Sequence, residues 1–79
     1  MEVLLYSRPG CHLCDEARAV LEAQRARTPF DLREIDVGTD DALELAYGIR
    51  VPVVLIDGEE IFELAVDAAA LASAVGDGL

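Results

Sequence analysis

The pattern of hydrophobic and polar positions changes at Pro9-Gly10, a turn signal near the N-terminus. Before this turn, the short apolar run V3-L-L-Y6 predicts a buried strand over Glu2 to Tyr6. After it, apolar residues recur at the spacing of one helix face, with charged residues on the other sides. These apolar residues are Leu13, Ala17, Val20 and Leu21. We therefore predict a helix that begins at Cys11 or His12 and ends at Arg25.

Two further elements follow Thr28-Pro29, which ends the helix because a residue before proline disfavours helical backbone. The run F30-D-L-R-E-I-D-V37 is rich in strand-forming residues and predicts a second strand. Thr39 then predicts the cap of a short helix, because the two aspartates that follow it bring negative charge to the positive end of the helix dipole. Gly48 predicts the end of this helix.

A strand and its hairpin partner come next. The β-branched run V51-P-V-V-L-I56 predicts a strand that is buried on both faces. Pro52 belongs at its first position, because proline cannot donate to a sheet ladder. Asp57-Gly58 is a two-residue hairpin signal, so Glu59 to Leu64 is predicted as the returning strand.

The last predicted helix runs from its cap at Asp67 through Ala74, with Leu71 and Val75 facing inward and Gly76 at its end. The order of elements is therefore β-α-β-α-β-β-α. A helical crossover favours parallel pairing of the first two strands, whereas the tight turn makes the last two antiparallel. All 79 residues are predicted to form a single α/β domain around a mixed sheet.

Charge and composition narrow the classes of partner. The chain has 16 acidic and 6 basic residues and a formal net charge of -10, a field that repels phosphate backbones and anionic lipid surfaces. We therefore expect no nucleic-acid partner and no membrane partner. The apolar runs fall far short of the roughly 20 residues that span a bilayer, and the N-terminus does not resemble a signal peptide. We expect a cytoplasmic monomer, in a compartment that keeps thiols reduced.

The chemistry-bearing motif is C11-H-L-C14, which contains both cysteines of the chain. The spacing places the two sulfurs about one helical turn apart. Cys11 lies at the helix start, where unpaired N–H groups and the dipole favour a thiolate, and Arg8 and a protonated His12 add to this effect. Cys14 lies one turn deeper and is followed by two acidic residues, which oppose a thiolate there. We therefore predict that Cys11 has the lower pKa and that Cys14 is the resolving thiol.

Other interpretations of these residues stay open. The same spacing serves as half of a tetrahedral zinc site, which needs four ligands, so a metal would have to bridge two copies of the chain. Two ordinary buried cysteines at helical spacing are the simplest structural alternative. His12 is a candidate substrate-binding residue that either tunes the redox potential through its charge or is merely exposed. For Tyr6 and Tyr47 we expect core packing with the hydroxyl at the edge.

The segment Y6-S-R-P-G-C-H-L-C-D-E-A17, the pair V51-P52 and the order of elements together resemble the glutaredoxin-like family of the thioredoxin fold. The resemblance implies a four-stranded mixed sheet flanked by three helices. It implies Cys11 as nucleophile and Cys14 as resolving cysteine. It also implies a cis Val51-Pro52 peptide bond, with the backbone before the proline turned toward the dithiol for pairing with a substrate.

The chain departs from the pattern of the glutathione-using members of this family. Those members resemble one another in a Thr-Val-Pro before this strand and in a Gly-Gly pair followed by Asp after the last strand. Here Arg50-Val51-Pro52 and F62-E-L-A-V-D67 occupy these places. We expect Arg8 and Arg50 to offer charge-assisted hydrogen bonds to a substrate carboxylate.

The leading hypothesis is a thiol-disulfide oxidoreductase that cycles Cys11 and Cys14 between dithiol and disulfide. The expected substrate is a disulfide-containing protein or a small thiol. An external thiol or a reductase, with glutathione among the candidates, would donate electrons, and no bound cofactor or metal is expected. Two alternatives remain: a monothiol-type, glutathione-dependent deglutathionylase that uses Cys11 alone, and a non-catalytic thioredoxin-fold binding module, with or without a metal bridge through C-x-x-C.

Overall fold

The computed structural model describes residues 1–76; residues 77–79 of the predicted domain over residues 1–79 lie outside the described part. The elements follow the predicted order, with one added 3-10 helix, η1. None of the helices within residues 1–76 is both long and apolar enough to cross a membrane. The strands are β1 (Glu2–Ser7), β2 (Asp31–Asp36), β3 (Val53–Ile56) and β4 (Glu59–Glu63). The helices are α1 (His12–Arg27), η1 (Val37–Thr39), α2 (Asp41–Tyr47) and α3 (Ala68–Ala74).

The strands form one mixed sheet in the order β2-β1-β3-β4. β1 pairs in parallel with β2, in a register that runs from Glu2 opposite Asp31 to Ser7 opposite Asp36. β1 and β3 are antiparallel, as are β3 and β4. The predicted mixed sheet with three flanking α-helices is confirmed. The α1 crossover makes the first pair of strands parallel, and the hairpin makes the last pair antiparallel.

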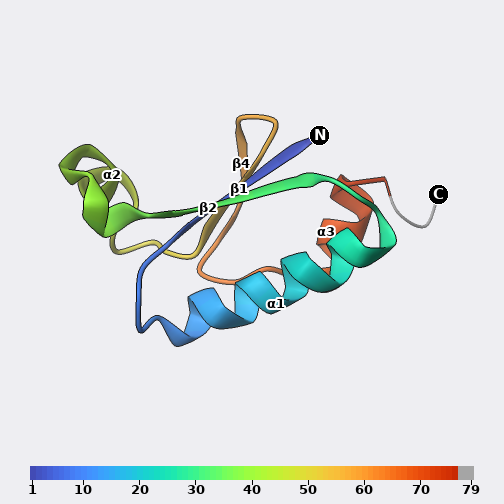
Figure 1. Cartoon of the computed structure of the whole chain (residues 1–79), viewed down its shortest axis with the longest axis horizontal. Coiled ribbons are helices and arrows are strands. Elements are labelled where there is room, and N and C mark those ends of the chain that lie inside the picture. The colour runs from blue at the N-terminus through green and yellow to red at the C-terminus, as the bar shows by residue number, and fades with distance from the viewer. Residues whose placement is uncertain (77–79) are drawn as a thin grey trace.

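The main core lies between the sheet and two helices. Side chains of β1 alternate between the faces of the sheet, and Val3 and Leu5 are completely buried on one of them. They share a core with Leu21 of α1 and Leu71 of α3. Figure 1 shows α1 and α3 lying together along this face. Burial of each such leucine stabilises the fold by about 2 kcal/mol.

A smaller core, which we call the cysteine cluster, lies near the start of α1. In Figure 1, α2 lies apart from α1 and α3, at the end of the sheet where β1 and β2 finish. The cluster joins this helix to the loops around the sheet end. Its buried members are Cys14, Val37 and Val51, and the partly buried residues packed against them are Tyr6, Cys11, Leu43 and Tyr47.

α1 differs from the prediction in where it ends and in the exposure of its first apolar residue. The helix ends at Arg27 instead of Arg25, because Thr28, the residue before a proline, is the first with extended backbone. Its N–H donates to the carbonyl of Gln24 at 2.8 Å. Leu13, predicted to face the core, is 46% exposed, because it lines an open groove beside α1 instead of packing against the sheet.

The prediction that Thr39 caps α2 is wrong by one residue. Asp40 is the cap, and its carboxylate accepts hydrogen bonds from two N–H groups of the first turn, at 2.8 and 3.2 Å. Thr39 ends η1 instead, and its hydroxyl donates to the carbonyl of Asp36 at 2.7 Å. The short turn that Asp36 caps therefore takes up Thr39 and leaves capping of α2 to the next residue.

The proline-led strand and the last helix agree closely with the sequence. The Val51-Pro52 peptide bond is cis, as the resemblance implies. Pro52 directly precedes β3, where no N–H is required for the ladder. Asp67 caps α3 by accepting a hydrogen bond at 2.8 Å from an N–H of the first turn. Gly76 follows the helix with a φ of 82°, the left-handed conformation typical of such an end.

Gly48 is the C-cap of α2, a position that holds a glycine for a steric reason. Its backbone is helical, with φ -52° and ψ -41°, and its N–H donates to the carbonyl oxygen of Glu44 at 2.8 Å. A Cβ atom at this position would lie 2.5 Å from that oxygen. Arg8 donates to the Gly48 carbonyl at 2.8 Å, so this residue also ties α2 to the loop before α1.

We predict that Gly48→Ala lowers the free energy of unfolding by about 1 to 3 kcal/mol, the range typical of overpacking. Urea unfolding followed by circular dichroism measures the change. Gly38→Ala is the matched control, because a Cβ there would lie 3.1 Å from Oδ1 of Asp36, a contact that a shift of a few tenths of an ångström relieves. Equal stability of Gly48→Ala and the wild type would show that the end of α2 relaxes without cost.

Candidate active site

The loop from β1 to α1 delivers Cys11 to the start of the helix. β1 ends at Ser7, and Arg8-Pro9-Gly10 turns the chain. Gly10 has a φ of 75°, a left-handed conformation that glycine adopts at little cost. Cys11 follows as the N-cap, with the extended backbone that this position requires (φ -90°, ψ 108°). The turn therefore places a cysteine where the first N–H groups of the helix are unpaired.

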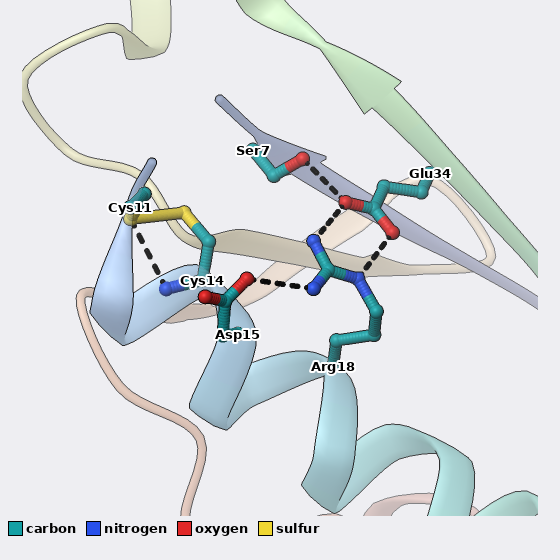
Figure 2. A network of polar contacts seen from close by, with 6 residues as sticks. All are labelled: Ser7, Cys11, Cys14, Asp15, Arg18 and Glu34. Carbon is teal, nitrogen blue, oxygen red and sulfur yellow. Dashed lines mark hydrogen bonds and ion pairs between the residues drawn. A yellow bond between two sulfur atoms is a disulfide. The ribbon is translucent and has the colours of Figure 1, made fainter. Parts of the chain in front are cut away.

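Cys11 and Cys14 lie one helical turn apart, with their Cα atoms separated by 5.1 Å and their sulfurs joined as a disulfide (Figure 2). Sγ of Cys11 accepts a hydrogen bond from the backbone N–H of Cys14 at 3.1 Å. The sulfur thus occupies the place of the oxygen that usually caps a helix. Cys14 is completely buried, whereas Cys11 is partly exposed, so the predicted difference in accessibility is confirmed.

This position has a direct chemical consequence in the dithiol form. The same N–H group and the positive end of the 16-residue helix α1 would stabilise a thiolate at Cys11. At Cys14, burial among apolar side chains favours the thiol over the thiolate. The pair can therefore hold an accessible nucleophile and a buried second thiol within reach of it.

Aromatic and apolar side chains enclose the buried end of the pair. Cys14 packs with Val37 and Val51, and Tyr6 of β1 and Tyr47 of α2 lie against them. The two rings are stacked, with centroids 4.5 Å apart and planes inclined by 20°. Burial, followed by the interaction with Tyr47, raises the pKa of Tyr6 above its ordinary value. The packing role predicted for both tyrosines is confirmed.

The two arginines predicted to bind a substrate carboxylate are engaged within the chain. Arg8 donates from Nη2 to Oε1 of Glu44 at 2.6 Å. Arg50 donates from Nε to Oε2 of Glu63 at 2.7 Å and also pairs with Glu60. These hydrogen bonds raise the pKa of Arg50 above its ordinary value, and the bond that Glu63 accepts has the largest effect. A substrate carboxylate would have to share the guanidinium with these partners or replace one of them.

The other predicted site residues lie at different depths. The side chain of His12 is 87% exposed, and its Nε2 lies 3.8 Å from a carboxylate oxygen one turn later in α1. Val51 and Pro52 are buried, and Val51 belongs to the cysteine cluster. The guanidinium carbon of Arg50 lies 5.7 Å from the ring centroid of Tyr47, at the rim of that cluster. The structure therefore gathers Val51, Pro52 and Arg50 around the cluster and leaves His12 on the surface.

A group of polar side chains beside the cysteines, which we call the Arg18 network, is absent from the predicted site (Figure 2). Arg18 of α1 donates to Oδ1 of Asp15 at 2.8 Å and to both carboxylate oxygens of Glu34, at 2.7 and 2.5 Å. Ser7 is 3% exposed and donates from Oγ to Oε2 of Glu34 at 2.7 Å. The network therefore ties the first turns of α1 to the ends of β1 and β2.

The sequence contains a signal for only part of this network. Arg18 follows Asp15 by three residues and Cys14 by four, so helical spacing predicts that they share a face. Glu34 carries no comparable signal, because it lies in β2 and meets Arg18 only through the parallel register of β1 and β2. Its role becomes visible only when the sheet is assembled.

The hydrogen bonds within the network shift two pKa values. Those from Arg18 lower the pKa of Glu34, burial acts against them, and the bond from Ser7 lowers this pKa further. Glu34 and then Asp15 raise the pKa of Arg18 above its ordinary value. Arg18 and Glu34 are therefore both ionised at neutral pH, and the ionised form of Glu34 favours the folded chain.

Two hollows of different character flank the start of α1. One is a groove of about 240 Å³ lined mainly by apolar side chains, among them Leu13, Val20, Leu64 and Val66. The other is a pocket of about 380 Å³ between the loop over residues 8–10 and the Arg18 network. The motif thus has an apolar surface on one side and a charged one on the other.

The described part of the chain offers no ready-made metal site. Within residues 1–76, no group of three or more His, Cys, Asp and Glu side chains is placed to hold a metal ion. A tetrahedral metal held by Cys11 and Cys14 would therefore need ligands other than the side chains that the structure describes.

A four-stranded mixed sheet in the order β2-β1-β3-β4 with a C-x-x-C pair at the start of α1 defines a thioredoxin-fold protein. More narrowly, the chain belongs to the family of glutaredoxin-like domains (DUF836), which matches residues 2–76. The match includes the cysteine pair and the cis proline. The resemblance drawn from the sequence is thereby confirmed.

Relatives and solved structures support this assignment. Uncharacterized protein Rv0508 of Mycobacterium tuberculosis is 34% identical over 64 residues, covering 75% of this chain and 66%, just under two thirds, of that protein. Target protein XcR50 from X. campestris is 36% identical, with a TM-score of 0.79 and coverage of 94% and 95% of the two chains. A mutant thioredoxin from Halobacterium salinarum NRC-1 is 30% identical, with a TM-score of 0.66 and coverage of 94% and 70%.

We predict that Glu34→Gln lowers the free energy of unfolding at pH 7 by about 0.5 to 1 kcal/mol, because it removes the charge from hydrogen bonds that solvent already screens. The lowered pKa of Glu34 means that its contribution is complete above the unfolded-state value of about 4.3 and is lost as the pH falls through the folded-state value. The difference from the wild type should therefore disappear in acid. Urea unfolding between pH 7 and pH 3 at constant ionic strength measures it.

Glu59→Gln is the matched control, since it removes the same charge from an exposed position on β4. Its effect should stay within about 0.5 kcal/mol at every pH. A deficit of Glu34→Gln that persists undiminished at pH 3 would show that lost packing, and not lost charge, is responsible.

We predict that in the reduced protein Cys11 reacts with iodoacetamide at least about tenfold faster than Cys14 at pH 7, and with a lower pKa. The N–H group that caps the sulfur and the exposure of Cys11 are the physical reasons. The variants Cys14→Ser and Cys11→Ser isolate each thiol, and mass spectrometry of the alkylated protein across pH gives both rates. A lower pKa for Cys14 would contradict the assignment.

Proposed function

We propose that this protein is a thiol-disulfide oxidoreductase that cycles Cys11 and Cys14 between dithiol and disulfide. The observation that carries the proposal is the position of the Cys11 sulfur, which caps α1, is partly exposed and accepts a hydrogen bond from the N–H of buried Cys14. A thiolate is stabilised there, and a second thiol lies within reach. Membership of the glutaredoxin-like family and likeness to a thioredoxin support the same chemistry.

The cycle consists of two thiol exchanges. The Cys11 thiolate attacks one sulfur of a substrate disulfide R–S–S–R′, forming a Cys11–S–S–R bond and releasing R′S⁻, which takes a proton from water. Cys14 then loses its proton to solvent, and its thiolate attacks the Cys11 sulfur and releases RS⁻, which is protonated in turn. Two electrons pass from protein to substrate, and an external thiol or a reductase restores the dithiol by the reverse exchanges.

A protein disulfide is the substrate class that we propose, with small thiols, glutathione included, as electron donors. Arg8 and Arg50 already bind carboxylates of this chain. The carboxylates of glutathione, a tripeptide, would compete with these internal carboxylates for the two arginines. The groove lined by Leu13 and Leu64 is mainly apolar, which suits an extended apolar segment of a larger partner. The proposed recognition therefore relies on apolar contact beside the nucleophile.

The proposed setting is the cytoplasm, where thiol reductants are plentiful. There the protein acts as a monomer without a bound cofactor. The net charge of -10 makes nucleic acids and anionic membranes unfavourable partners.

We predict that the purified wild-type protein oxidises reversibly to one intramolecular disulfide in defined thiol-disulfide buffers. Alkylation at each redox poise, followed by mass spectrometry, measures the oxidised fraction. Cys14→Ser should stop after the first exchange and keep one substrate thiol on Cys11 as a mixed disulfide, because the resolving thiol is gone. The control Cys11→Ser should form no such adduct, since its remaining thiol is buried.

The same experiment separates the alternatives. If the Cys14→Ser variant continues to turn over with glutathione, the protein uses the monothiol mechanism, in which Cys11 acts alone. If both thiols stay free at every redox poise, or if a metal protects them in protein purified without chelator, the oxidoreductase hypothesis is wrong and the binding module is favoured.

A further inference from the structure

We infer that Arg18 is a positioning residue for the second exchange, because it neutralises carboxylates that would otherwise oppose a thiolate at Cys14. This inference rests on the proposed dithiol cycle and adds a residue that acts on the resolving sulfur through charge. It concerns the moment at which Cys14 loses its proton and attacks Cys11.

Arg18 and Cys14 share a face of α1. Residues four apart on a helix are neighbours, with about 5 to 6 Å between their Cβ atoms. Cys14 is completely buried, and the Arg18 side chain is 37% exposed. Figure 2 shows the side chains of Cys14 and Arg18 on the same side of α1, and the guanidinium is the more exposed of the two.

Two carboxylates accept hydrogen bonds from the guanidinium of Arg18. Asp15 directly follows Cys14 in the chain, and Glu34 reaches the same guanidinium from β2. Each carboxylate alone would repel a thiolate at Cys14 and make loss of its proton harder. With Arg18 in place, the three side chains together carry one negative charge, whereas without it they would carry two.

Other titratable groups around Cys14 contribute less at this step. In the mixed disulfide Cys11 carries no charge, and Tyr6 is neutral at neutral pH, since burial raises the pKa of its hydroxyl. The charge of Arg8 is balanced by Glu44, to which it donates a hydrogen bond. His12 and Glu16 are exposed on α1, where solvent screens their charges. These groups are Cys11, Tyr6 and Tyr47 in the cysteine cluster, and Arg8, His12 and Glu16 outside it. Asp36 lines the same pocket as the Arg18 network. Its carboxylate accepts a hydrogen bond from the N–H of Gly38, and substitutions at Arg18 and Glu34 leave its charge unchanged.

Two substitutions separate charge from structure. Arg18→Gln and Glu34→Gln weaken the same hydrogen bonds, yet they change the local charge in opposite directions. Arg18→Gln leaves two carboxylates without a cation, whereas Glu34→Gln leaves the cation balanced by Asp15 alone. A network that is merely structural would respond alike to both substitutions. A network that acts through charge responds with opposite signs.

The test is stopped-flow absorbance with one equivalent of 2,2′-dithiodipyridine, because each exchange releases one pyridine-2-thione. The first phase reports Cys11, and the second reports Cys14. For Arg18→Gln we expect a second phase about tenfold slower at pH 7, the effect of about one pKa unit at the resolving thiol. Its pH profile should move to higher pH, while the first phase stays within about twofold of the wild type.

Three further variants sharpen the result. Glu34→Gln should accelerate the second phase at pH 7 and move its profile to lower pH, because one carboxylate is gone. Arg18→Lys should restore most of the wild-type rate, because it keeps the charge. Arg25→Gln is the matched control, since it removes the same charge from an exposed position further along α1, and it should leave both phases unchanged.

The inference is wrong if Arg18→Gln leaves the second phase unchanged, or if Arg18→Gln and Glu34→Gln slow it alike. If the wild-type protein shows no second phase, the proposed dithiol cycle itself is wrong. The failure of the inference and the failure of the proposed function are therefore distinguishable. If Arg18→Gln does not fold, the other variants decide. A Glu34→Gln profile that stays in place or moves to higher pH would then overturn the inference.

Discussion

The hydrogen bond from the N–H of Cys14 to the sulfur of Cys11 is the contact on which the site depends. A helix start leaves N–H groups that it cannot pair internally, and here a sulfur accepts one of them. Because the cap must have extended backbone, Gly10 turns the chain just before it. The cap then sets the phase of α1, which directs Cys14 into the cysteine cluster and leaves Cys11 partly exposed.

Excess negative charge is the main constraint around this dithiol. The chain carries a net charge of -10, and three of its arginines bind carboxylates near the motif: Arg8, Arg18 and Arg50. Exposed ion pairs of this kind contribute only about 0 to 1 kcal/mol each to stability. Their larger effect is on the electrostatic potential that a thiolate meets, since one uncompensated carboxylate nearby changes the equilibrium between thiol and thiolate.

Most of the fold could be predicted, because its signals are local. Helical periodicity, the Asp57-Gly58 turn and Pro52 predicted the element order and the mixed sheet. The errors arose where local signals competed. Thr39 and Asp40 are both good caps, and η1 decided between them. Leu13 fits the apolar face of α1, yet it lines a groove at the surface, because periodicity does not report which part of a face meets the sheet.

The sequence by itself determined the cysteine pair, its place at a helix start and the difference in depth between the two sulfurs. These features involve residues no more than four apart, which backbone geometry relates directly. Only the tertiary structure decided which charges surround the pair. Arg8, Arg18 and Arg50 find partners 36, 16 and 13 residues away. Such contacts follow from strand register and helix packing, so no local pattern specifies them.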